Sequence, residues 1–471
     1  MKKKRVNEME LKSILKNLPE VKAPVEKKLS FNVKLKWTII ILAAFFVLAN
    51  IVLYGVQPVV KERFEFFSII MGTDFGSIIT LGIGPIVMAS IILQLLVGSG
   101  ILNIDLKTEE GKKFFQGLQK LLVFAFIIFE AVVFVLMKGV EAVPGYTGIV
   151  IIQLILGGLV IMFMDEVVTK WGFGSGVSLF IVAGVGWRIF ASLFQFMIRT
   201  PGGDIQNCLA DFANTSCAGK ILVLIQSFIN QDPTGALLAA SVLIMSVVVF
   251  LGVVWAQSLK VNIPLSYDRL RGYGIKWPLA FFYCGVIPVI LTGALIANIQ
   301  LFGSLLENIG YPILGHFSQG QAVSGLAYWL GSSDLIENTI RGSLTGNMLL
   351  QGLTHILIFV GFSVLFSVFW VKTSGQDAST QAKNIMSSGL QISGFRKDER
   401  VLESILARYV MPLTIMGGAA IGLLAAAANL LGTLVGGTSM LLAIMIIYQL
   451  YTNIAQQHSV DMHPAIRKFI G

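Results

Sequence analysis

Long apolar runs separated by short polar or charged stretches dominate the pattern along this chain. Ten runs approach the roughly 20 residues that an α-helix needs to cross the hydrocarbon core of a bilayer. A helix satisfies its backbone hydrogen bonds internally, so the pattern indicates an all-α polytopic membrane protein. The predicted spans are 37–57, 77–98, 118–137, 147–167, 177–199, 235–258, 277–300, 349–371, 408–431 and 436–455.

The run from Ser77 to Gly100 differs from a simple anchor because Gly82, Gly84 and Pro85 interrupt it. Glycine removes side-chain bulk and proline lacks a backbone donor, so we expect this run to make close helix contacts or to border a cavity. Ile83 and Val87 lie one helical turn apart beside the interruption. If both face inward they form a hydrophobic constriction, whereas the pattern alone favours ordinary helix packing for a single Ile or Val in a span.

Composition and charge agree with a membrane location. Of the 471 residues, 55% are hydrophobic and only 13% are charged, about half the charge of a soluble protein. The tails and loops on the side of the N-terminus hold 28 of the 35 Lys and Arg residues. Positively charged loops stay in the cytoplasm, so this bias predicts cytoplasmic N- and C-termini. The net charge of +9 is then mainly a topology signal, with anionic lipid or an acidic or RNA-bearing partner as secondary explanations.

The spans divide into two sets of five. Because five is odd, a structural repeat requires the second set to be inverted, with a pathway at the interface between the halves. The first run follows a charged segment without a small-residue cleavage site, which predicts a retained span. The expected divisions are a basic cytoplasmic segment 1–36, halves 37–199 and 235–455, an external hinge loop 200–234, cytoplasmic loops of about 259–276 and 372–407, and a cytoplasmic tail 456–471.

A short apolar segment, Phe64 to Met71 (FEFFSIIM), follows the first span. It is too short to cross a bilayer and leads into the glycine-containing run. A half-helix that dips back into the membrane and an amphipathic segment on the membrane surface both fit this pattern.

The external loop carries Cys208 and Cys217, in a compartment where disulfides persist. The sequence leaves open whether they are joined. The same loop contains a sequon at Asn214, whose glycosylation is also open, while Cys284 lies in an apolar span and is expected simply to pack there.

Catalytic chemistry is not expected. The four histidines show no metal-binding spacing, and the chain contains no nucleophile elbow or phosphate-binding loop. We therefore predict no catalytic residues, metal or cofactor. The glycines 172, 174 and 176 lack dinucleotide-binding spacing and indicate a tight turn before a helix.

Few polar side chains lie at membrane depth. Glu130 and Arg188 are the clear ionisable candidates for a transport role, and pairing with a neighbouring helix is the favoured explanation for each. The amides Gln94, Asn298 and Gln300 can join helices through hydrogen bonds worth roughly 1 kcal/mol each. Such bonds suit a helix seam that opens.

Several long motifs resemble the SecY family, whose members form the central subunit of the protein-conducting translocon. The residues of these motifs are most similar to those of the archaeal branch. The resemblance runs from about Lys36 to the C-terminus. It is carried by ITLGIGPIVMASIILQLLVGSG, DEVVTKWGFGSGVSLFI (165–181), IPVILTGALIANIQL (287–301), YPILGH (311–316), SGFRKDER (393–400) and HPAI (463–466).

This resemblance implies a clamshell of two inverted five-helix halves around an hourglass pore. It assigns Phe64 to Asp74, within a plug segment of about 58–76, to a seal of the external funnel, with apolar residues Phe64, Phe66, Phe67, Ile69, Ile70 and Met71. It places a pore ring at Ile83, Val87, Val177, Ile181, Ile287 and Ile290. Val177 is smaller than the isoleucine frequent there in the family.

The resemblance also implies a lateral gate between the second and third spans on one side and the seventh and eighth on the other. Its polar seam would contain Gln94, Glu130, Asn298 and Gln300. The cytoplasmic loops would dock a ribosome through Arg269, Arg271, Lys276, Arg396 and Lys397. SecE and a small third subunit are implied partners in a heterotrimer.

The main hypothesis is therefore a passive channel in the cell membrane. It would translocate secretory polypeptides and release transmembrane segments laterally, driven by a ribosome or another partner. The alternative from a different class is a secondary transporter of a small solute. Scarce intramembrane charge and long basic cytoplasmic loops favour the channel, and a stand-alone intramembrane enzyme or insertase lacks a catalytic constellation.

Overall fold

The computed structural model describes residues 18–26, 29–56, 76–102, 104, 106, 108–199, 205–210, 212, 217–267, 274–318, 321–387, 390–391 and 398–461. Nine helices in this part of the chain are long and apolar enough to cross a membrane. They are α2 (Phe31–Asn50), α6 (Glu109–Leu136), α7 (Thr147–Trp171), α8 (Gly176–Phe194), α10 (Pro233–Ser258), α11 (Ile287–Asn308), α14 (Gly346–Thr373), α16 (Glu399–Leu430) and α17 (Gly437–Asp461). A shorter apolar helix, α5 (Gly84–Gly98), occupies most of the tenth predicted span.

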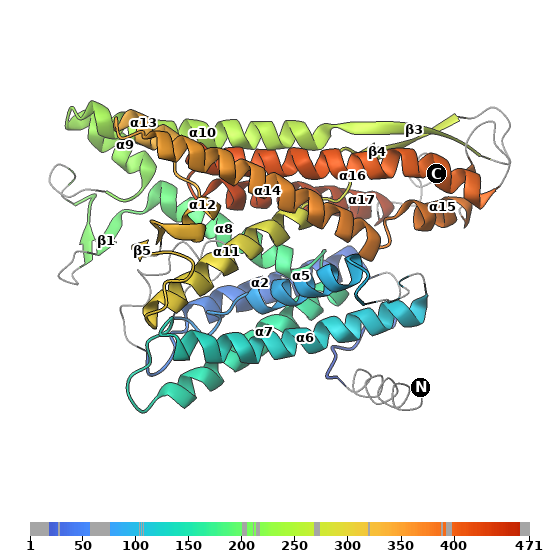
Figure 1. The fold of residues 1–471 in the computed structure, drawn as a ribbon, viewed down its shortest axis with the longest axis horizontal. Helices are drawn as coiled ribbons and strands as arrows, with labels where there is room; N and C mark the ends of the chain where they lie inside the picture. Colours follow the sequence, from blue (N-terminus) through green and yellow to red (C-terminus); the bar gives the residue numbers. More distant parts are fainter. Residues whose placement is uncertain are drawn as a thin grey trace.

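The ten helices form a clamshell of two inverted halves. Figure 1 shows α2, α6 and α7 of the first half in the lower part of the view and α10, α14 and α16 of the second half above them. The halves meet where α5 packs against α11 and α14, and where α8 packs against α17. One continuous apolar core crosses this junction and includes Ile86, Phe180, Ile290 and Leu441.

The smaller elements gather at the two ends of the helices (Figure 1). At one end lie β1 (Met197–Arg199), β2 (Ile205–Asn207), α9 (Lys220–Ile229), β5 (Phe317–Ser318), β6 (Gln321–Ala322), α12 (Gly325–Leu330) and α13 (Leu335–Ile340). At the other end lie β3 (Lys260–Tyr267), β4 (Gly274–Ala280), β7 (Leu390–Gln391) and α15 (Ala378–Ser387).

The span predicted at 277–300 was wrong at both ends, because α11 runs from Ile287 to Asn308. The first residues of the predicted span, 277–280, belong instead to β4. This strand pairs antiparallel with β3, so that Lys260 lies opposite Ala280 and Ser266 opposite Gly274. An apolar and aromatic run fits a strand as well as a helix. Only the pairing partner decided between them.

Other helix boundaries differ because hydropathy detects only the part of a helix inside the membrane. The helices α6 and α16 each begin nine residues before the predicted spans at 118 and 408. Both starts are capped: the Thr108 hydroxyl accepts the Gly111 N–H at 3.1 Å, and the Asp398 carboxylate accepts the Arg400 N–H at 2.9 Å. The helices therefore continue beyond the apolar runs.

The first span also ends earlier than predicted, at Asn50 instead of residue 57. After α2 the chain is held by the segment before α5: the Leu53 N–H donates to the Gly76 carbonyl at 2.9 Å, and the Ile78 N–H donates to the Ile51 carbonyl at 2.9 Å. Because this pairing uses backbone groups of Ile51 and Leu53, α2 does not continue past Asn50.

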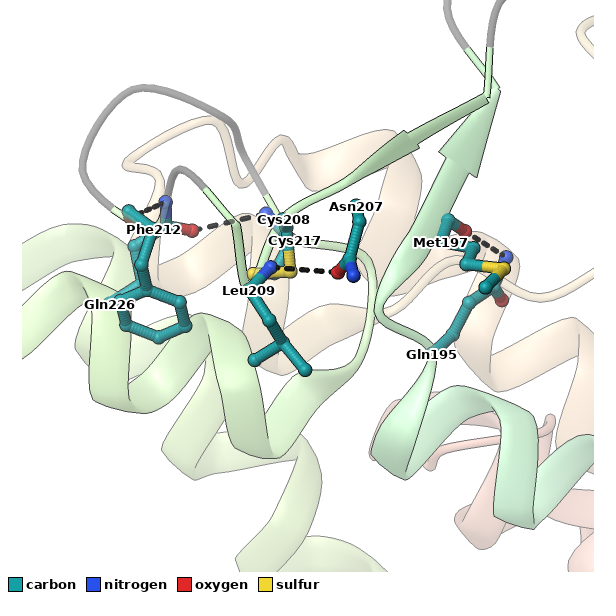
Figure 2. The surroundings of a disulfide bond; sticks show 8 residues. All are labelled: Gln195, Met197, Asn207, Cys208, Leu209, Phe212, Cys217 and Gln226. Atoms are coloured by element: carbon teal, nitrogen blue, oxygen red, sulfur yellow. Dashed lines mark hydrogen bonds between the residues drawn. A yellow bond between two sulfur atoms is a disulfide. The ribbon is translucent and has the colours of Figure 1, made fainter.

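The disulfide that the sequence left open is present between Cys208 and Cys217, whose Cα atoms lie 5.4 Å apart (Figure 2). Gln226 of α9 holds the loop that the bridge closes. Its side-chain oxygen accepts the Cys217 N–H at 3.1 Å, and its side-chain nitrogen donates to the Phe212 carbonyl at 2.8 Å. The loop is therefore fastened to α9 as well as closed. Asn214 lies outside the described residues.

Candidate functional site

A small cavity of about 20 Å³ lies between the two halves, and we call it the central cavity. Its wall combines side chains from two helices of the first half and two of the second. The lining residues are Ile83, Gly84 and Val87 of α5 and its start, Ile181 and Val185 of α8, Ile290, Gly293 and Ala294 of α11, and Thr438, Ser439 and Leu442 of α17. A space of this size holds about one water molecule.

The chain begins the two cavity helices α5 and α11 in the same way. Gly82 has a φ of +52° and is followed three residues later by Pro85, while Gly285 has a φ of +63° and is followed by Pro288. Glycine tolerates this left-handed turn, and proline suits the first turn of a helix. Each half therefore starts its second long apolar segment with a turn that brings the helix N-terminus to the cavity.

The matching turns reveal a residue-level repeat that sequence reasoning missed. The hexapeptides GIGPIV (82–87) and GVIPVI (285–290) occupy equivalent places in the two halves. They align Val87 with Ile290, and both side chains line the central cavity. A broken apolar segment at corresponding positions of two inverted halves is a signal that could have located this site.

The residues before α5 form turns instead of helix. The N–H groups of Thr80, Gly82 and Gly84 each donate to the carbonyl three residues earlier, at 2.9–3.1 Å. Helix is thus confined to Gly84–Gly98, although the predicted span began at residue 77. These turns place Ile83 directly at the N-terminus of α5.

Four of the six predicted ring residues meet at the cavity, namely Ile83, Val87, Ile181 and Ile290. All four are at least nine-tenths buried. The other two, Val177 and Ile287, do not line it and pack against the surrounding apolar core about one turn away.

The prediction missed the cavity residues Val185, Gly293, Ala294, Thr438, Ser439 and Leu442. Val185 follows Ile181 by one helical turn, so helical spacing could have identified it. The contribution of α17 has no comparable local signal, since it depends on how the last helix packs against α8 and α11.

A carboxylate determines where α8 begins. The Oδ1 atom of Asp165 in α7 accepts the Val177 N–H at 2.8 Å, next to the first residue of the helix, Gly176. An acceptor at this position satisfies one of the free N–H groups of a helix start. Asp165 thereby sets the height at which Ile181 reaches the cavity.

The seam where the halves meet is closed mainly by apolar and aromatic contacts. A side chain at Gly98 of α5 would overlap the ring of Phe369 in α14, so these helices lie in close contact. The rings of Phe129 in α6 and Phe302 in α11 have centroids 6.4 Å apart.

The four predicted gate residues Gln94, Glu130, Asn298 and Gln300 are buried, and no hydrogen bond in the described structure joins any of them to another. Asn298 donates to the Ala294 carbonyl of its own helix at 2.8 Å, and the Gln300 side chain lies 3.5 Å from the Ala327 carbonyl of α12. One side-chain oxygen of Gln94 and one of Glu130 have no partner.

The two predicted cytoplasmic loops belong to one sheet, which the sequence did not indicate. Strand β3 pairs with β4 on one side and with β7 on the other, where Ser266 lies opposite Gln391 and Tyr267 opposite Leu390. A second apolar cluster joins Ile263 and Leu279 of this sheet to α15 and the start of α16. The strands place Lys276 opposite Pro264.

Other predicted residues lie outside the described part of the chain. They are the plug residues Phe64, Phe66, Phe67, Ile69, Ile70 and Met71 and the docking residues Arg269, Arg271, Arg396 and Lys397. Within the described residues, no group of three His, Cys, Asp or Glu side chains is arranged to hold a metal ion.

Comparisons with known proteins agree with this architecture. The SecY family model matches residues 77–451. The protein translocase subunit SecY of Methanothermobacter thermautotrophicus is 44% identical over 460 residues, which cover 96% of this chain and 97% of that protein.

Solved structures resemble the fold over nearly its whole length. One is a SecY protein whose plug domain stabilises the closed state of the translocation channel, with a TM-score of 0.81, 38% identity and coverage of 96% of this chain and 98% of that one. Another is Sec61 in the canine ribosome-channel complex, with a TM-score of 0.78, 37% identity and the same coverage of the two chains. The chain therefore belongs to the SecY family.

Proposed function

We propose that this chain is the channel subunit of a protein translocon. It conducts secretory polypeptides across the cell membrane and releases transmembrane segments sideways into the lipid. The observation that carries this proposal is the aliphatic cavity at the junction of two inverted halves, with side chains of α5, α8, α11 and α17 converging on it. Family membership supports the same conclusion.

The chemistry of the cavity suits a seal that any sequence can pass. Ile83, Val87 and Ile290 offer dispersion contacts, which make little geometric demand on a passing chain and do not hold it. Although the space is large enough for about one water, its mainly apolar wall offers few hydrogen-bond partners, so the closed constriction stays dry and excludes ions. We assign the ring to the six predicted residues together with Val185 and Leu442.

The plug is proposed to be the segment from Phe64 to Asp74, which would cover the external side of the cavity. Its support is the apolar pattern FEFFSIIM and the plug domain of the similar SecY structure. The chain reaches the cavity immediately afterwards, at Ile83.

Lateral release requires the seam between α5 and α6 on one side and α11 and α14 on the other to open. Buried polar atoms without partners cost about 1–3 kcal/mol each, so Gln94 and Glu130 weaken the closed seam. An open seam would let both side chains meet water or an entering signal sequence. We propose that these two residues, with Asn298 and Gln300, tune the ease of opening.

The sheet β4-β3-β7 would receive the ribosome on the cytoplasmic side. Its support is the basic character of both loops, the pairing that brings them together, and the ribosome bound to the similar Sec61 channel. Basic side chains such as Arg269 and Arg396 suit RNA phosphates. The Lys and Arg distribution supports cytoplasmic termini, and SecE with a small third subunit would complete the heterotrimer.

Site-specific photo-crosslinking tests this function. A crosslinking amino acid is placed at Ile83, Val87 or Ile290 in membranes that contain the chain with its two small partners, and a ribosome-stalled secretory chain is supplied. Leu154 of α7, fully buried but away from the cavity, is the matched control position.

Strong crosslinks from the three cavity positions, with none from the control, are expected. Crosslinks absent from all three would overturn the ring assignment. Failure of a wild-type complex to translocate the chain at all, together with uptake of a small solute, would replace the channel by a solute transporter.

A further inference from the structure

A series of buried and partly buried hydrogen bonds connects helix α12 with the central cavity. His355 of α14 lies at its centre, with Nδ1 2.9 Å from the Leu330 carbonyl oxygen and Nε2 3.1 Å from Nδ2 of Asn429. The Oδ1 atom of Asn429 accepts the Thr438 N–H at 2.7 Å and the Thr438 hydroxyl at 3.0 Å. Thr438 itself lines the cavity. We call His355, Asn429 and Thr438 the polar relay.

The direction of every bond in the polar relay is determined by its ends. The Thr438 backbone N–H can only donate, so the amide atom facing it is the oxygen of Asn429. The Asn429 nitrogen then donates to Nε2 of His355, which must be unprotonated. The proton of the imidazole is on Nδ1, where it meets a carbonyl that can only accept. A single arrangement therefore satisfies all members.

The polar relay also satisfies two buried helix ends. Leu330 is the last residue of α12, so its carbonyl has no partner within that helix, and Thr438 is the second residue of α17, so its N–H has none either. His355 and Asn429 supply both partners. Replacing His355 with an apolar side chain would leave the Leu330 carbonyl and the Asn429 nitrogen without these bonds.

The orientation of Thr438 affects the cavity wall. Its hydroxyl is directed to Asn429, whereas its methyl carbon lies on the side of Gly293, 3.4 Å from where a Cβ atom on that glycine would stand. Gly293 is another cavity residue. A confined water needs two to four polar partners. A Thr438 hydroxyl that pointed into the cavity would supply one and favour hydration, whereas a methyl group supplies none.

We propose that His355 is a positioning residue of the central cavity, which acts through Asn429 to hold the Thr438 hydroxyl out of the cavity and keep the constriction dry. The inference rests on the proposed function only in taking this cavity as the closed pore. His355 does not line the cavity and acts entirely through its neighbours.

The test measures water access to the cavity in the complete complex reconstituted into vesicles. Ser439, which lines the cavity without belonging to the relay, is changed to cysteine in a Cys284→Ala background, and its labelling by a small charged thiol reagent is followed. With H355F we expect labelling about tenfold faster. Loss of one buried hydrogen bond changes the ratio of hydrated to dry cavities by about this factor.

Two further variants separate the relay from general loosening. H355Q keeps a donor for Leu330 and an acceptor for Asn429, so its labelling is expected to stay near the wild-type rate. The Gln351 side chain, one turn before His355 in α14, donates to the Tyr328 carbonyl of α12 at 2.7 Å and accepts the Ser333 hydroxyl at 2.5 Å, and it has no hydrogen bond to the relay side chains. Q351L therefore removes two hydrogen bonds near α12 without breaking the relay, and it is also expected to leave labelling unchanged.

The double variant H355F/T438V identifies the group that admits water. Valine has no hydroxyl, so labelling should return towards the wild-type rate. N429L removes the link between His355 and Thr438 and should raise labelling as H355F does, which keeps the test available if H355F fails to assemble.

The proposal is overturned if assembled H355F and N429L label at the wild-type rate, or if Q351L labels as fast as H355F. It is also overturned if H355F/T438V labels as fast as H355F alone. Translocation of a secretory chain into vesicles with the unaltered protein is measured separately. Its failure would count against the proposed function, whereas labelling requires no translocating chain.

Discussion

The backbone carbonyl oxygen of Ile78 lies so close to Gly157 of α7 that a methyl group on Gly157 would overlap it. Ile78 belongs to the turns that precede α5, and these turns end at the cavity residue Ile83. The absence of a side chain at Gly157 therefore allows the turns before α5 to sit deep against α7. Backbone atoms cannot move aside as a flexible side chain can.

Gly157→Ala is expected to destabilise the protein by about 1–3 kcal/mol, because an extra methyl group in a tightly packed site forces the backbone apart. Thermal unfolding of the purified complex measures the effect as a lower Tm. Gly148 lies in the same helix with open space where its Cβ would be, so G148A is the matched control and should cost nothing. Equal Tm values for the two variants would contradict the packing argument.

Asp165→Ala is expected to cost about 0.5–2 kcal/mol, the usual effect of losing the acceptor at a helix N-terminus. The Val177 N–H loses its partner at the start of α8. Asp165→Asn keeps an oxygen at this position and should retain most of the stability. Chemical or thermal unfolding of the two variants provides the comparison, and an equal loss in both would show that charge, and not the acceptor, matters.

Glu166, near the end of α7, bridges Lys120 of α6 and Lys170 of its own helix, with both lysine nitrogens 2.9 Å from its carboxylate. Glu166→Gln removes the charge between the two lysines, of which Lys170 keeps its ion pair with Glu20, and should destabilise the complex by about 1–3 kcal/mol. High salt should reduce the loss by screening the lysines.

Glu109 provides the control for this ion pair. Its contact with Lys112 at 3.7 Å is exposed, so E109Q should change stability by less than about 0.5 kcal/mol. A similar loss of unfolding free energy for E109Q and E166Q would show that the Glu166 bridge contributes no more to stability than an exposed ion pair.

Asp334, between α12 and α13, should make stability depend on pH. Desolvation of the carboxyl, followed by the charge of Glu337, raises the pKa of Asp334 to about 6 from an ordinary value of 3.8. The folded protein therefore holds a proton that the unfolded chain releases between these pH values, so the contribution to stability is full below about pH 4 and is lost as the pH rises through about 6.

Asp334→Asn removes this loss. The residue is partly open to solvent, which screens the charge and limits the effect to about 1 kcal/mol. Tm profiles from pH 4.5 to 8 should diverge, with D334N becoming the more stable form as the pH rises. Parallel profiles for the two proteins would exclude a role for this carboxyl.

The sequence by itself determined how many apolar segments cross the membrane and roughly where, because the cost of placing polar groups in lipid acts on each segment separately. The interruption at Gly82, Gly84 and Pro85 located one wall of the cavity for a similar local reason. The motifs of the resemblance indicated the family, and the comparisons confirm it.

Only the tertiary structure decided which segments meet. Residues 274–280 form a strand because β3 pairs with them, and Leu390 and Gln391 join the same sheet from more than a hundred residues away. Thr438 and Leu442 reach the cavity because α17 packs against α8, and His355 meets Asn429 because α14 packs against α16. Such contacts depend on side chains from distant segments at the same time, whereas hydrophobic periodicity reports only the environment of one segment.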